Sequence, residues 1–80
     1  MEKILTLNIE KLNKTDSKLL RQGILVHETS EDYFLVKIED FTHKDLDYAF
    51  SEAGGYSKNY LEILHSSLDQ GYTLIKILLV

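Results

Sequence analysis

The sequence has no cysteine, no proline and no tryptophan. Without cysteine the chain cannot form disulfides, use a thiolate nucleophile or bind zinc through sulfur. This composition fits a reducing compartment, and we expect a cytoplasmic protein. No run of apolar residues is longer than four, and the first residues lack the long apolar segment of a signal peptide. We therefore expect no membrane-spanning segment.

Glycine is also scarce, with four residues among 80. The hydrophobic fraction is 44% and the charged fraction is 28%, which is ordinary for a folded globule. A chain of this length has room for one hydrophobic core. The sequence therefore predicts a single small α/β domain over residues 1–80, with the glycines marking its turns.

Four segments have the pattern of strands. Residues 3–9 alternate between apolar and polar side chains, as a half-buried strand does. Residues 24–28 and 33–39 are rich in β-branched and aromatic residues, and the polar segment between them predicts a hairpin. Residues 72–80 are largely apolar on both faces. This last pattern predicts a strand that is covered on both sides or whose outer face contacts a partner.

Three segments have the pattern of helices. A short helix begins at Thr15 or Asp16, either of which can cap it, and ends before Gly23. Residues 42–53 open with a capping box and continue with apolar residues at helical spacing. Residues 57–70 open with a serine cap and carry a leucine stripe.

The element order is therefore strand, helix, strand, strand, helix, helix, strand. We expect an α+β fold in the form of a two-layer sandwich. About four strands form a mainly antiparallel sheet, and the helices lie mostly on one face. This order resembles a ferredoxin-like plait or a variant of it.

The residues that carry enzyme chemistry are not arranged for it. Ser66 and Ser67 follow His65 directly, and adjacent residues of a helix do not face each other. His27, His43 and His65 belong to three different predicted elements, without the short spacing of metal-binding pairs. We therefore predict no enzyme activity, no catalytic residues, no metal site and no cofactor.

Charge is distributed unevenly along the chain. The net charge is −4, which argues against direct binding to nucleic acid. Residues 28–52 carry eight acids against two lysines, a local charge of −6. Tyrosines lie among these acids, and this combination suits a surface that binds a basic protein. The candidate partner-binding residues are Glu28, Glu31, Asp32, Tyr33, Asp45, Asp47, Tyr48 and Glu52. The alternative is a solvated acidic face that keeps the protein soluble.

The first functional hypothesis is a small acidic protein–protein interaction module. Its compact, acidic, cysteine-free α/β form resembles small proteins of phages and mobile elements, including anti-restriction and anti-CRISPR inhibitors. That resemblance rests on no motif and assigns no residue roles, but it implies an inhibitor of a basic protein that handles nucleic acid. The alternative is a structural module that forms a homodimer through its C-terminal strand, if that strand lies at a sheet edge.

Overall fold

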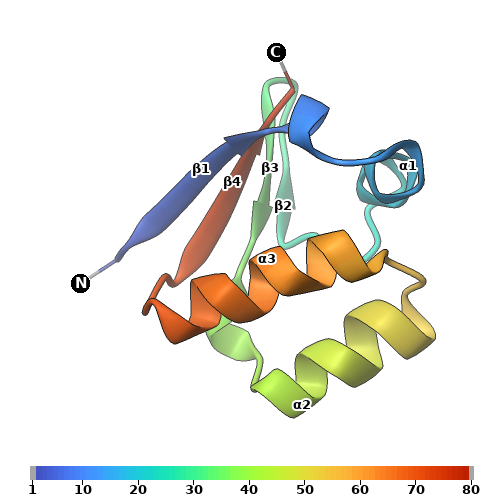
Figure 1. The fold of residues 1–80 in the computed structure, drawn as a ribbon. Helices are drawn as coiled ribbons and strands as arrows, with labels where there is room; N and C mark the ends of the chain where they lie inside the picture. The colour runs from blue at the N-terminus through green and yellow to red at the C-terminus, as the bar shows by residue number, and fades with distance from the viewer. Residues whose placement is uncertain (1, 80) are drawn as a thin grey trace.

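The computed structural model describes residues 2–79 and shows an α+β fold with a four-stranded sheet and three helices (Figure 1). Two of the helices are extended or preceded by short 3₁₀ or π segments, labelled η. In chain order the elements are β1 (Ile4–Asn8), η1 (Ile9–Lys11), α1 (Lys14–Arg21), β2 (Glu28–Thr29), β3 (Tyr33–Val36), η2 (Ile38–Asp40), α2 (His43–Asp45), η3 (Leu46–Ala53), α3 (Lys58–Asp69) and β4 (Leu74–Leu78).

The strand order across the sheet is β1-β4-β3-β2. The last strand, β4, lies between β1, to which it is parallel, and β3, to which it is antiparallel. The sheet is therefore mixed, and the prediction of a mainly antiparallel sheet was wrong. The ferredoxin-like strand order is not confirmed. A period of two fixes which side chains share a face, but it does not encode which strand lies beside which.

The central place of β4 agrees with its apolar character. Ile75 and Ile77 are fully buried against the helices, while Leu74, Lys76 and Leu78 on the opposite face are partly exposed. The helices lie on one side of the sheet (Figure 1). The predicted end of this strand at Val80 lies outside the described residues.

The helix starts follow local capping chemistry. Thr42 and Asp45 form the predicted capping box, and Ser57 caps α3 through the backbone N–H of Tyr60. The first helix begins earlier than predicted, because the side chain of Asn13 caps it by accepting a hydrogen bond from the Asp16 N–H at 2.8 Å. Asp16 is thereby free for another contact.

The predicted hairpin is shorter than expected. Only Glu28 and Thr29 form β2, and the residues before them make a loop in which Leu25 has a positive φ of 56°. The apolar side chains of this loop pack on the core rather than alternating across a sheet. Tertiary packing therefore overrides the strand preference of residues 24–27.

Asp16 is a carboxylate buried completely inside the protein. It accepts hydrogen bonds from the backbone N–H of Ser57 at 2.8 Å and from the Ser57 hydroxyl. Ser57 is the residue that caps α3, so the negative charge lies at the positive end of that helix. This contact joins α1 to α3 across 41 residues of sequence.

Two buried tyrosines lie beside this contact, with ring centroids 4.6 Å apart. Burial raises the pKa of Tyr56 and of Tyr60, and the nearby Asp16 charge adds to both effects. The Tyr56 hydroxyl donates a hydrogen bond to the Ile24 carbonyl at 2.5 Å. The Tyr60 hydroxyl is buried and has no hydrogen-bond partner among the residues that the structure describes. The two hydroxyls therefore make opposite contributions to stability.

The substitutions Tyr60→Phe and Tyr56→Phe test this difference. Tyr60→Phe removes an unsatisfied buried hydroxyl and should raise the free energy of unfolding by about 1 kcal/mol. Tyr56→Phe leaves the Ile24 carbonyl without its donor and should lower it by about 1 kcal/mol. Urea denaturation of both variants measures the effects. A similar loss in both variants would mean that Tyr60 has a hydrogen-bond partner after all.

Candidate functional site

The candidate acidic residues do not form one surface. Glu28, Glu31, Asp32 and Tyr33 lie in the β2–β3 hairpin, whereas the other four lie in α2 and η3. Tyr33 pairs with Leu78 at the end of β4. At the other end of the sheet, Glu39 of η2, just before α2, donates a backbone hydrogen bond to Thr73. Figure 1 shows the hairpin turn beside the C-terminus and α2 at the opposite end of the molecule.

The hairpin side chains are largely engaged with their own chain. The Tyr33 hydroxyl donates to the Glu28 carboxylate at 3.2 Å, and the Lys76 ammonium lies 4.6 Å from the centre of the Tyr33 ring. A cation over the face of a ring is an attractive contact. Tyr33 is therefore already in contact with an acidic and a basic side chain of the same protein. The other two candidate residues of the hairpin, Glu31 and Asp32, lie at its turn.

The acidic helical surface, which we define as Asp45, Asp47, Tyr48 and Glu52, has a different character. Tyr48 exposes 66% of its surface and is, among the described residues, the more exposed of two large hydrophobic side chains. Asp45 precedes it by three positions, Asp47 precedes it by one, and Glu52 follows it by four. All three acids are exposed. The surface therefore presents an exposed aromatic side chain with three exposed acids near it in sequence.

The core holds this surface in place. Leu46 and Phe50 are fully buried and anchor η3, and the Phe50 ring contacts Phe41 edge-on with centroids 5.0 Å apart. The segment is π-helical, a rare conformation that often occurs at functional sites. Tyr48 lies between the two anchors in sequence and points outward.

Hydrogen bonds at the start of α2 keep Asp45 charged. The Asp45 carboxylate accepts a hydrogen bond from the Thr42 N–H at 3.1 Å, and the Thr42 hydroxyl accepts one from the Asp45 N–H at 3.1 Å. Hydrogen bonding of the carboxylate by the backbone and then the side chain of Thr42, with a smaller contribution from Lys44, lowers the pKa of Asp45 below its ordinary value of 3.8. The carboxylate thus stays ionised throughout the physiological range.

The structure also brings together two histidines that the sequence analysis separated. His43 begins α2 and His65 lies in α3, and their Nδ1 atoms are 2.5 Å apart. The Nε2 atom of His43 lies 2.7 Å from Asp69, and that of His65 lies 2.7 Å from Asp47. Four side chains therefore form a continuous hydrogen-bonded chain, and Asp47 belongs to both this chain and the acidic helical surface.

The two imidazole rings lie in one plane. Their planes differ by 6° and their centroids are 4.8 Å apart. The centroid separation equals the Nδ1–Nδ1 distance plus the distance from each centroid to the Nδ1 atom of its own ring. Both Nδ1 atoms therefore lie on the line between the centroids. The rings of His43 and His65 therefore meet edge to edge and are not stacked face to face.

A signal for this pair existed in the sequence. Two consecutive helices joined by a short connection pack antiparallel, so the start of the first lies beside the later part of the second. His43 and His65 occupy those two positions. His27 lies elsewhere, at the uncovered face of the sheet near Glu28 and Lys37. No group of three metal-binding side chains converges among residues 2–79.

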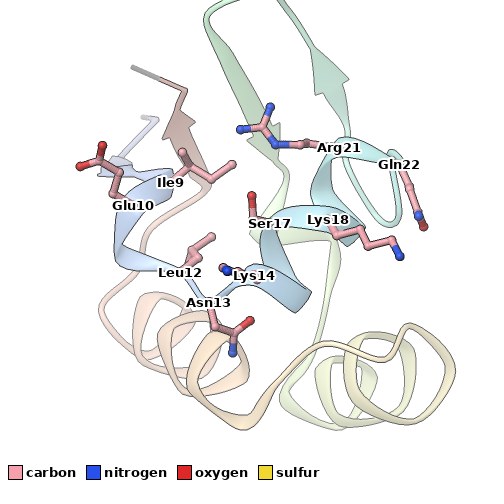
Figure 2. Close-up of a pocket in the computed structure, with 9 residues that line it drawn as sticks. All are labelled: Ile9, Glu10, Leu12, Asn13, Lys14, Ser17, Lys18, Arg21 and Gln22. Atoms are coloured by element: carbon pink, nitrogen blue, oxygen red, sulfur yellow. The ribbon is translucent and has the colours of Figure 1, made fainter.

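A groove between η1 and α1 is lined by three of the five basic residues in residues 1–27. Its lining includes Ile9 and Leu12 with Lys14, Lys18 and Arg21. Figure 2 shows that the charged ends of Lys18 and Arg21 point in different directions. Because the cationic groups do not converge, this groove lacks the arrangement of an anion-binding site.

Within the described residues, no helix has the length and apolar character that crossing a bilayer requires.

Because Asp45 caps α2 in its ionised form, part of the free energy of unfolding should depend on pH. A carboxyl whose pKa is lowered on folding stabilises the protein above its unfolded pKa, and that stability is lost as the pH falls through the folded value. The stability difference between the native protein and Asp45→Asn should shrink as the pH falls from about 5 to about 2. Urea denaturation across this range measures it, with Glu31→Gln as the control. A difference that is constant with pH would contradict the assignment.

The sequence matches no protein-family model, no curated protein and no solved structure.

Proposed function

We propose that this protein is a small interaction module whose acidic helical surface binds a protein partner with a basic surface. The observation that carries the proposal is the exposure of Tyr48 among three carboxylates. Tyrosine is enriched among the residues that dominate binding energy, because it offers a large contact area and a polar end. Surrounding acids accelerate encounter with a basic partner and exclude acidic ones.

The proposal assigns different roles to the two acidic groups. The acidic helical surface makes the direct contact, because Tyr48 projects from it into solvent. Glu31 and Asp32 lie at the far end of the sheet and add to the negative field at longer range. Screening at physiological salt limits that contribution, since the Debye length is about 8 Å.

The proposed partner class is a basic protein that handles nucleic acid. Such proteins bind phosphates with clustered lysine and arginine side chains, and a surface of carboxylates is complementary to them. Occupying that basic surface would inhibit the partner, as anti-restriction and anti-CRISPR proteins of phages and mobile elements do. The role needs binding and no catalysis by this chain.

Dimerisation through the C-terminal strand is the weaker alternative. Both edges of β4 are occupied along Leu74–Leu78, by β1 on one side and by β3 on the other. Pairing with another chain requires unpaired backbone groups at a sheet edge. The geometry of β4 therefore favours the binding module over this second function.

The test compares two double variants of the same protein. Asp45 and Asp47 make internal hydrogen bonds, so the cleanest change to the helical surface is Tyr48→Ala with Glu52→Ser. The matched control is Glu31→Ser with Asp32→Ser in the hairpin. Affinity capture with mass spectrometry identifies the partner, and calorimetry then measures its Kd with each protein at several salt concentrations.

We expect the helical double variant to weaken binding by about 30-fold, because loss of an anchoring aromatic costs about 2 kcal/mol. The hairpin variant should change Kd by less than about 3-fold, and rising salt should weaken binding of the native protein. Unchanged affinity in the helical variant, or a Kd that does not depend on salt, would refute the proposed function.

A further inference from the structure

We propose that His43 and His65 share one excess proton between their Nδ1 atoms, and that this proton joins α2 and η3 to α3 in a pH-dependent way. The inference deepens the proposed function, because Asp47 belongs to both the histidine chain and the acidic helical surface. The inference rests on the proposed function only in the identity of the partner that the acidic helical surface binds. The proton-sharing pair itself follows from the geometry of residues in this chain.

The two carboxylates determine where the histidine protons lie. An ionised carboxylate can only accept hydrogen bonds, so the Nε2 atom of His43 must carry the hydrogen that Asp69 accepts. The same holds for Nε2 of His65 and Asp47. A neutral imidazole has one N–H, so in two neutral rings both Nδ1 atoms would present lone pairs to each other at 2.5 Å.

One additional proton removes this conflict. A proton on either Nδ1 is donated to the other, which makes an N–H···N hydrogen bond between an imidazolium and an imidazole. The Nδ1 atoms lie on the line between the ring centroids, which is the linear geometry that a hydrogen bond prefers. Hydrogen bonds with a charged donor are shorter than neutral ones, in agreement with the short Nδ1–Nδ1 distance.

The number of protons decides whether the contact holds. With no excess proton, two lone pairs face each other, and with two excess protons, two N–H groups meet. Only the singly protonated pair is attractive, and its positive charge then lies between the carboxylates of Asp47 and Asp69. Both rings are partly exposed, with side-chain exposures of 48% for His43 and 26% for His65, so protons exchange with solvent.

Other charged groups on the packed elements make contacts elsewhere or belong to exposed residues. The Asp45 carboxylate is bound to Thr42, Asp40 of η2 pairs with Lys37 at 4.0 Å, and Glu62 of α3 lines the groove beside β1. Contacts with the pair are therefore made by the two aspartates alone within the described residues. The remaining charged groups on these elements are Glu39, Lys44, Glu52 and Lys58.

The consequence for the acidic helical surface is direct. The proton bound between the rings keeps His65 aligned with Asp47, one residue before Tyr48. The position of Asp47, and the contact of η3 with α3, should therefore respond to pH.

The test uses the isolated protein and needs no partner. Thermal unfolding is measured from about pH 4 to about pH 9 for the native protein, His43→Gln and His65→Gln, with His27→Gln as the matched control. The Tm difference between the native protein and either pair variant should pass through a maximum inside this pH range, with a height of about 4 °C. The control should follow the native curve. Nitrogen-15 NMR should show hydrogen on both Nε2 atoms at that maximum.

Two outcomes would overturn the proposal. A Tm difference that does not vary with pH would mean that the rings share no proton. A rise of Tm with added zinc chloride in the native protein, absent in both pair variants and reversed by a chelator, would mean that the Nδ1 atoms hold a metal ion instead. Failure of the partner-binding test leaves both measurements unaffected, so the two proposals fail separately.

Discussion

The buried contact between Asp16 and Ser57 is the constraint on which the rest of the structure depends. It places a carboxylate at the N-terminus of α3 and joins the first helix to the third. A buried charge is costly unless hydrogen bonds compensate it, and Ser57 supplies two. The position of α3 in turn defines where η3 packs, because η3 and α3 contact each other. The candidate surface therefore rests on an interaction far from its own residues.

Charge and packing divide the middle of the chain into two parts. The segment with a local charge of −6 runs from the hairpin through β3 to α2 and η3, and the buried strand β3 separates its ends. At the hairpin, Tyr33 is bound to Glu28 and Lys76. In η3, Leu46 and Phe50 take the buried positions and Tyr48 remains outside. A single acidic stretch in sequence thus becomes two separate surfaces, and of these the helical one carries the exposed Tyr48.

Local signals in the sequence were reliable where local chemistry decides the structure. The Thr42 capping box, the Ser57 cap and the turn at Gly71, with its positive φ, all appear as predicted, because each depends on residues within one turn. The strand order, the loop at residues 24–27 and the His43–His65 contact depend on packing between distant segments. The acidic composition of the candidate site was predictable from the sequence. The separation of its residues into a hairpin group and a helical group was not, because it follows from the path of β3 between them.

We propose the acidic helical surface as the contact surface of the protein. Backbone NMR of the labelled protein, titrated with the partner that affinity capture identifies, tests it most directly. We expect the largest chemical-shift changes at residues 45–52, and small changes at residues 2–8 and 28–33. Changes confined to the hairpin or to β1 would contradict it.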